Sequence, residues 1–212
     1  MSFKASKFPW KKLESEYIIG LDEVGRGCLA GSVYAAAVLI RRNQKLPRSI
    51  SSHVTDSKLL SPHKRKDLSL LIRDNLLFAI GFATVREIEE LNIHYASLLA
   101  MHRAFENLQI APDMWPDCHL LIDGNKKIKT LDIQQTCVIK GDLRALPIGA
   151  AAIGAKVERD EELVRISQEY PGYGFEVHKG YATRTHKKAL KKLGPTNIHR
   201  RTFNGVKELL AP

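Results

Sequence analysis

The sequence has only three cysteines, and they lie far apart in the chain. Cys28, Cys118 and Cys137 have neither the spacing of a zinc site nor the even number of a disulfide framework. Unpaired thiols are typical of a reducing compartment, so we expect a cytoplasmic protein. Histidine and cysteine nowhere stand at metal-ligand spacing, which argues against a zinc enzyme.

Long apolar runs are absent too. The longest, Ala35–Ile40, is far too short to cross a bilayer, so we expect no membrane contact. No apolar segment follows the first seven residues, and we expect no secretory signal. Without repeats, low-complexity tracts or a linker, residues 1–212 predict a single domain and a monomer. Its catalytic core would span about 15–170 and a basic helical segment about 171–212.

Acidic residues are fewer than basic ones, 23 against 33, and the formal net charge is +10. The excess lies in residues 177–207, which contain nine Lys or Arg and no Asp or Glu. A local excess of this kind indicates a polyanionic partner, although a solvated helix face gives the same pattern. The stretch predicts a helix over 183–193, preceded by a glycine-rich loop over 171–180, with a short last helix over 204–210.

Acids follow three predicted strands at the point where each strand ends. Tyr17–Leu21 is an apolar stretch of strand formers, and Asp22 and Glu23 come directly after it. Residues 119–122 run into Asp123, and residues 134–139 are followed by Asp142. An acid before a glycine turn is also common surface chemistry. Three such strands in one chain, however, can bring all four acids to one site.

Four carboxylates suit Mg²⁺ or Mn²⁺, which prefer hard oxygen ligands. Two such ions held about 3.5–4 Å apart are a frequent means of phosphodiester cleavage. One ion activates the attacking water and the other stabilises the leaving oxygen, so no histidine base is needed. The adjoining Gly25-Arg26-Gly27 turn allows close backbone approach to a ligand.

The chain resembles the bacterial type 2 ribonucleases H (RNase HII) from about Tyr17 to Phe203. The matching segments, in order, are 22–27, 29–31, 56–58, 123–124, 140–142, 155–157, 159–160, 173–175, 178–181, Thr183 and 199–200. Each segment is weakly specific, whereas their order and number are highly specific.

This resemblance implies the ribonuclease H fold, a five-stranded mixed sheet with helices on both faces. It implies an endoribonuclease that cleaves 5′ of ribonucleotides embedded in duplex DNA, as in ribonucleotide excision repair, and also cuts the RNA strand of RNA/DNA hybrids. Cleavage would leave 3′-OH and 5′-phosphate ends. The metal-binding and catalytic acids would be Asp22, Glu23, Asp123 and Asp142.

The resemblance also implies a substrate-binding set. The backbone of Gly25, Arg26 and Gly27 would contact the ribose 2′-OH and the adjacent phosphates. Tyr181 would pack on the deoxyribose that follows the ribonucleotide, although a tyrosine there could equally belong to the core. We also expect the substrate to be bound by the basic residues Lys58, Lys179 and Arg184.

The chain departs from the family pattern at three positions. Ser32 stands where proline is usual, and Gly149 and Ala152 stand where serines are usual. We expect the loss of these two hydroxyls to affect hydrogen bonding around the site or phosphate positioning, and through them the rate, while the metal acids stay intact. Gly149 and Gly154 are also expected to weaken their helix, by about 1 kcal/mol each relative to alanine.

Two alternatives remain open at the level of sequence. A non-catalytic protein that binds RNA/DNA hybrids would have lost a metal acid, and all four are present. A type 3 ribonuclease H would carry an extra N-terminal substrate-binding domain and lack the Gly-Arg-Gly loop. Only 21 residues precede Asp22, so we expect no such domain.

Overall fold

Five strands form one mixed sheet with the order β3-β2-β1-β4-β5. The computed structural model describes residues 6–52, 54 and 60–210. The central strand β1 pairs antiparallel with β2 and parallel with β4, and β5 continues the parallel half. The strands are β1 (Tyr17–Val24), β2 (Val33–Arg41), β3 (Leu77–Ala83), β4 (Cys118–Asp123) and β5 (Gln134–Val138). The predicted five-stranded mixed sheet is confirmed.

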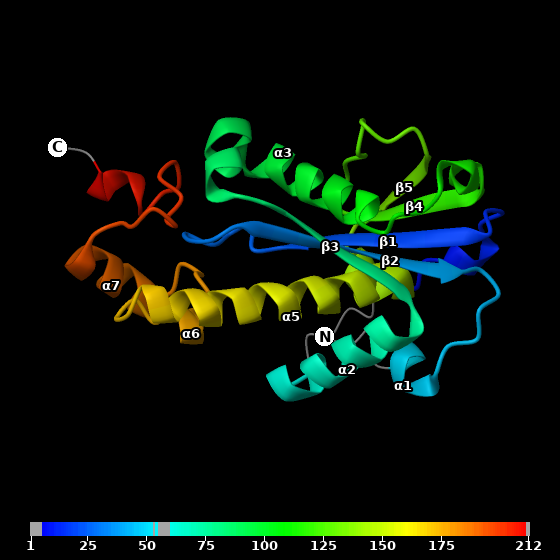
Figure 1. Cartoon of the computed structure of the whole chain (residues 1–212), viewed down its shortest axis with the longest axis horizontal. Coiled ribbons are helices and arrows are strands. Elements are labelled where there is room, and N and C mark those ends of the chain that lie inside the picture. The colour runs from blue at the N-terminus through cyan, green and yellow to red at the C-terminus, as the bar shows by residue number, and fades with distance from the viewer. Residues whose placement is uncertain (1–5, 53, 55–59, 211–212) are drawn as a thin grey trace.

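Helices cover both faces of this sheet, as Figure 1 shows. One apolar layer joins α3 to the sheet, and a second joins α2 and α5 to its other face. No helix in the described ranges is long and apolar enough to cross a membrane. The helices are α1 (Arg48–Ser51), α2 (Pro62–Asn75), α3 (Val85–Glu106), α4 (Gly141–Arg144), α5 (Leu146–Glu169), α6 (Phe175–His178) and α7 (Arg184–Leu193), with 3-10 turns η1 (Trp10–Lys12), η3 (Pro112–Asp117) and η4 (Lys207–Leu209).

The segment after α5 packs beyond the end of the sheet (Figure 1) around its own apolar cluster. Its basic helix α7 begins after Thr183, whose Oγ1 accepts a hydrogen bond from the His186 N–H at 3.2 Å, and ends before Gly194, where φ is 79°. These bounds match the predicted 183–193 helix. The prediction of a plain loop over 171–180 was wrong, because α6 forms there, and the predicted last helix is only the η4 turn.

Helix α5 lies against the sheet at a spacing that only glycine permits. A Cβ on Gly20 of β1 would lie 2.0 Å from the Pro147 carbonyl carbon at the start of α5. Further along α5, a Cβ on Gly154 would lie 2.1 Å from the Phe78 ring, and one on Gly149 would lie 2.8 Å from the Asp142 carbonyl oxygen. Alanine would therefore not strengthen α5 at these positions, contrary to what helix propensity alone suggests.

We predict that Gly20→Ala destabilises the protein by about 2–3 kcal/mol, because the added methyl group meets backbone atoms rather than a movable side chain. Gly27→Ala is the matched control, since a Cβ there has no neighbour within 4 Å. It should change the free energy of unfolding by no more than about 0.5 kcal/mol. Urea denaturation measures both, and equal unfolding midpoints would contradict the close approach of α5 to β1.

Candidate active site

The two halves of the acid cluster come from neighbouring parallel strands. Asp22 and Glu23 lie near the end of β1, and Asp123 is the last residue of β4. Because β1 and β4 run in the same direction, their carboxyl ends meet at one edge of the sheet. One carboxylate oxygen from each of these three residues lies within 4.8 Å of the other two.

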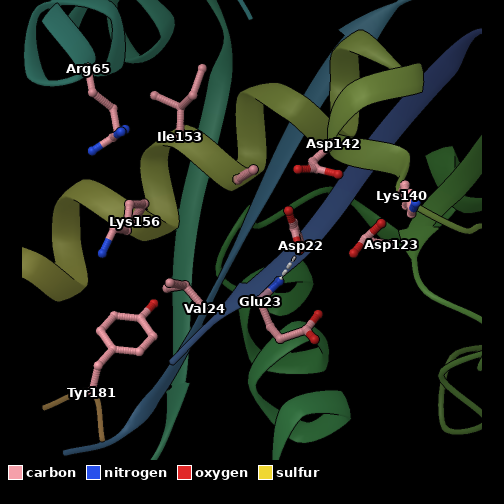
Figure 2. A pocket seen from close by; sticks show the side chains of 11 residues that line it. Asp22, Glu23, Val24, Arg65, Asp123, Lys140, Asp142, Ile153, Lys156 and Tyr181 are labelled. Atoms are coloured by element: carbon pink, nitrogen blue, oxygen red, sulfur yellow. Dashed lines mark hydrogen bonds between the residues drawn. The ribbon is translucent and has the colours of Figure 1, made fainter. Parts of the chain in front are cut away.

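Asp142 completes this group from a short helix, whereas the sequence suggested the end of a strand. Strand β5 ends at Val138, and Lys140 adopts a left-handed conformation with φ 55°. The chain then turns into the short helix α4, which carries Asp142 in its first turn. Asp142 is 8% exposed, and Figure 2 shows its carboxylate beside that of Asp22. The four predicted acids therefore line one pocket.

This pocket has a volume of about 400 Å³. Figure 2 shows its acids at one end, with Lys140 beside Asp123, and Arg65, Lys156 and Tyr181 at the other. Its lining comprises Asp22, Glu23, Val24, Arg65, Asp123, Lys140, Asp142, Ala152, Ile153, Lys156 and Tyr181. Ala152 stands in the wall, so the hydroxyl that the family pattern places there is missing from the pocket itself.

Burial and mutual repulsion strain the acid cluster electrostatically. Burial raises the pKa of Asp22 well above its usual range, and the negative charges of Asp123, Glu23 and Asp142 raise it further. Burial also raises the pKa of Asp123, while the hydrogen bond from the Gly141 N–H acts in the opposite direction. Folding thus disfavours the ionised forms of Asp22 and Asp123.

A few donors offset part of that charge. The Gly141 N–H donates to Asp123 Oδ1 at 2.6 Å, and the Glu23 N–H donates to Asp22 Oδ1 at 2.7 Å. Arg26 Nη1 forms an ion pair with Glu23 Oε1 at 2.9 Å. The first contact also fixes the rotamer of Asp123 by tying β4 to the start of α4.

The donor set fits a hard divalent cation. Every acidic side chain in the pocket offers carboxylate oxygens, and neither His nor Cys lines it in the described part of the chain. Carboxylates buried close together are costly unless a cation compensates them, and the raised pKa values of Asp22 and Asp123 reflect that deficit. Oxygen ligands of this kind are what Mg²⁺ and Mn²⁺ bind.

The Gly25-Arg26-Gly27 loop begins directly at the end of β1. Gly25 has φ 93°, and a Cβ on it would lie 2.2 Å from Nε of Arg159. Gly27, in contrast, is exposed and has open space around it. The loop therefore has one side packed against the protein and one side accessible to a ligand.

Of the predicted substrate-binding side chains, Tyr181 lies in the acid pocket and is 36% exposed. Its ring lies 5.2 Å from Lys156 Nζ, and its backbone forms an isolated β-bridge with Cys28. Lys179 lines a neighbouring cavity that shares Tyr181 with the acid pocket, and Arg184 is exposed at the start of α7. Lys58 lies outside the described residues.

Sequence reasoning missed several residues around the site. Arg65 and Lys156 line the pocket, and Arg159 lies behind the Gly-Arg-Gly loop. Lys156 and Arg159 stand four and seven residues after Ala152 on α5, so the helical period could have placed all three on one face. Arg65 gave no such signal, because α2 reaches the pocket only through tertiary packing.

Comparison with known proteins gives a consistent result. The sequence profile of the family described as Ribonuclease HII matches residues 19–206. A ribonuclease HII of Pelagibacter ubique is 44% identical over 91% of this chain and 98% of its own length. One of Bacteroides fragilis is 47% identical over 92% of each chain. The crystal structure of ribonuclease H2 from Pyrococcus horikoshii is similar with a TM-score of 0.75 and 25% identity, over 91% of this chain and 96% of that one.

We predict that Asp22→Asn stabilises the metal-free protein at neutral pH. The pKa of Asp22 is higher in the folded state than in the unfolded chain, so its ionisation opposes folding. The penalty is absent below the unfolded value of about 3.9, grows as pH rises toward the folded-state pKa, and is constant above it. The gain from Asp22→Asn should therefore shrink as the pH is lowered.

Denaturant unfolding in the presence of EDTA at several pH values measures this gain. The matched control is Asp132→Asn, an exposed position outside the pocket, which should show no such gain. With added Mn²⁺ the wild type should become more stable than Asp22→Asn. The reason is that an ion bound to the folded state adds to stability, and the wild type should bind it more tightly. A less stable Asp22→Asn in EDTA at neutral pH would contradict the repulsion described above.

Proposed function

Because the chain belongs to the ribonuclease HII family, it is a metal-dependent endoribonuclease that acts on nucleic acid, and we propose its substrate and the role of each residue. It hydrolyses the phosphodiester 5′ of a ribonucleotide embedded in duplex DNA and also cuts the RNA strand of RNA/DNA hybrids. The products carry 3′-OH and 5′-phosphate ends. The observation that carries this proposal is the position of the Gly-Arg-Gly loop directly beside the acid cluster at the end of β1.

We assign the catalytic role to Asp22, Glu23, Asp123 and Asp142. Their oxygens would hold two divalent ions, Mg²⁺ or Mn²⁺. Bound there, such ions supply an activated water and stabilise the leaving oxygen. The carboxylates set the position of that chemistry, because Asp22 lies between the other acids and Asp123 is oriented by the Gly141 N–H. Nothing in this scheme requires a histidine base.

The substrate-reading role falls to the loop and to Tyr181. Gly27 is open to a ribose, and a backbone contact to its 2′-OH is the feature that separates RNA from DNA at one position. Tyr181 stands across the pocket from the acids, where its ring can pack on the next sugar. A 2′-OH on that second sugar would crowd the ring, which favours a junction from RNA to DNA.

Four lysines on α7 are proposed to contact phosphates. Lys187, Lys188, Lys191 and Lys192 are all exposed, whereas His186 and Leu190 face inward. None of the four forms an ion pair in the described part of the chain. Unneutralised cations on one face of a helix suit a phosphate backbone. We assign Lys179 and Arg184, which precede them, to the same surface, and Lys58 to the substrate on sequence grounds alone.

The remaining features of the proposal concern the protein as a whole. We propose a cytoplasmic monomer with one domain over 1–212, in which the catalytic core and the basic segment act together in ribonucleotide excision repair. The family match favours this type 2 enzyme over the type 3 alternative. The four acids favour catalysis over hybrid binding alone.

The proposed function predicts a simple cleavage pattern with Mg²⁺ or Mn²⁺. A duplex with one embedded ribonucleotide should be cut once, on the 5′ side of that ribonucleotide, and an all-DNA duplex of the same sequence should stay intact. Asp22→Asn should lose nearly all cleavage while circular dichroism and duplex binding remain unchanged. Asp132→Asn should cleave like the wild type. Gel analysis of labelled duplexes measures the cleavage outcomes.

Two results would overturn this scheme separately. Cutting of the all-DNA duplex at a similar rate would refute the reading of a 2′-OH and leave a general nuclease. Substantial cleavage by Asp22→Asn would refute the metal assignment.

The proposed phosphate contacts of α7 predict a change in salt dependence. Replacing Lys187, Lys188, Lys191 and Lys192 by Gln should flatten the slope of log K against log salt by roughly 0.9 for each phosphate that is no longer neutralised. Duplex binding at several salt concentrations measures this slope. The control variant replaces Lys7, Lys11, Lys12 and Lys45 by Gln, which removes the same amount of charge from another part of the protein. An unchanged slope in the α7 variant would mean that these lysines face solvent and do not contact phosphates.

A further inference from the structure

Two arginines are fully buried in this protein, although arginine rarely is. Arg159 on α5 and Arg200, which follows α7, are each 0% exposed. Neither forms an ion pair with a carboxylate within the described ranges. A buried cation without a counter-ion is costly, so its hydrogen-bond partners are informative.

Those partners are backbone carbonyls concentrated in one loop. Arg200 donates from Nη1 to the Arg26 carbonyl and from Nε to the Gly31 carbonyl, each at 2.9 Å. Arg159 donates from Nη2 to the Ala30 carbonyl at 3.1 Å and from Nε to the Ser32 carbonyl at 3.2 Å. Two guanidinium groups thus hold both ends of the segment from Arg26 to Ser32, which contains part of the Gly-Arg-Gly loop.

These contacts fix the direction of the loop amides. All described peptide bonds are trans, so the N–H of each peptide points opposite to its carbonyl. Since the Arg26 carbonyl points to Arg200, the Gly27 N–H points the opposite way, away from Arg200, and Gly27 itself is exposed. The donor that would meet a ribose is therefore oriented from behind by Arg200.

Arg159 also connects the loop to Tyr181. Arg159 Nη1 donates to the Lys179 carbonyl at 2.9 Å, and its guanidinium lies 5.9 Å from the Tyr181 ring. The Leu29 N–H donates to the Gly180 carbonyl at 2.8 Å, and the backbone of Cys28 forms an isolated β-bridge with that of Tyr181. One side chain thus contacts both segments that the proposed function assigns to sugar recognition.

One end of the Arg200 guanidinium forms no hydrogen bond within the described structure. Its Nη2 is buried and has no hydrogen-bond partner in the described structure. Burial lowers the pKa of Arg200 to about 9, which still leaves it protonated at neutral pH. A positive charge behind an outward-facing N–H strengthens that N–H as a donor toward an oxygen ligand.

We propose that Arg159 and Arg200 are positioning residues that hold the Gly25–Gly27 loop and Tyr181 at one fixed separation. Selectivity for a ribonucleotide followed by a deoxyribonucleotide depends on that separation, because two sugars must be read at once. The inference rests on the proposed function and deepens it, since it assigns the geometry of recognition to two residues that do not touch the substrate.

The test compares Arg159→Lys and Arg200→Lys with the wild type. Lysine keeps the charge but cannot reproduce a planar fork that bonds two carbonyls. On the single-ribonucleotide duplex each variant should lose roughly 10-fold to 100-fold in kcat/KM, the effect of a displaced substrate-positioning group. On a continuous RNA/DNA hybrid the loss should be several-fold smaller, so the ratio of the two values falls. Arg86→Lys, at an 87% exposed side chain on α3, is the control and should leave the ratio unchanged.

A purely structural role would lower kcat/KM on both substrates equally, in proportion to the folded fraction seen by circular dichroism. That result, or unchanged kinetics, would overturn the inference while the proposed function stands. If the wild type itself does not require a ribonucleotide, the proposed function fails whatever the variants do.

The wild-type protein gives a second measurement that does not depend on either variant folding. Nitrogen-15 relaxation of the Gly25, Arg26 and Gly27 amides should give order parameters near those of β1, about 0.85, without substrate. Values below about 0.6 would show a flexible loop and overturn the inference.

Discussion

The carboxylates at the ends of β1 and β4 and in α4 repel one another, and the rest of the site is arranged around that repulsion. Parallel pairing of β1 with β4 forces Asp22 and Asp123 to one edge, and the turn at Lys140 adds Asp142. The Gly141 N–H and Arg26 offset part of that charge. Such a cluster suits divalent cations, and under the proposed function their binding would add to the stability of the folded protein.

Helix α5 connects the acid cluster to the other parts of the site. Its start lies against Gly20 of β1, so its position relative to the acid cluster is fixed by backbone contact. Further along, it carries Lys156 into the pocket and Arg159 behind the Gly-Arg-Gly loop. The acid cluster, the loop and Tyr181 therefore all lie against this one helix, although their residues are far apart in the sequence.

The grouping of the acids could be predicted from the sequence because each follows a predicted strand, and parallel strands end together. The mixed sheet could be predicted from the family resemblance, and the end of the helix over 183–193 from Gly194 and Pro195. The place of Asp142 in α4 could not, since the left-handed turn at Lys140 has no local signature. The burial of Arg159 and Arg200 could not either, because an arginine in a sequence is ordinarily expected at the surface.

The proposed function requires Asp22, Glu23, Asp123 and Asp142 to hold two divalent ions at the scissile phosphate. Anomalous scattering of Mn²⁺ tests this directly, in a crystal of the wild type with a duplex that contains one ribonucleotide. A non-cleavable phosphate on the 5′ side of that ribonucleotide would keep the duplex intact. The proposed function predicts two manganese peaks about 3.5–4 Å apart among Asp22, Glu23, Asp123 and Asp142. Absence of manganese from these carboxylates, or its binding elsewhere along the duplex, would contradict it.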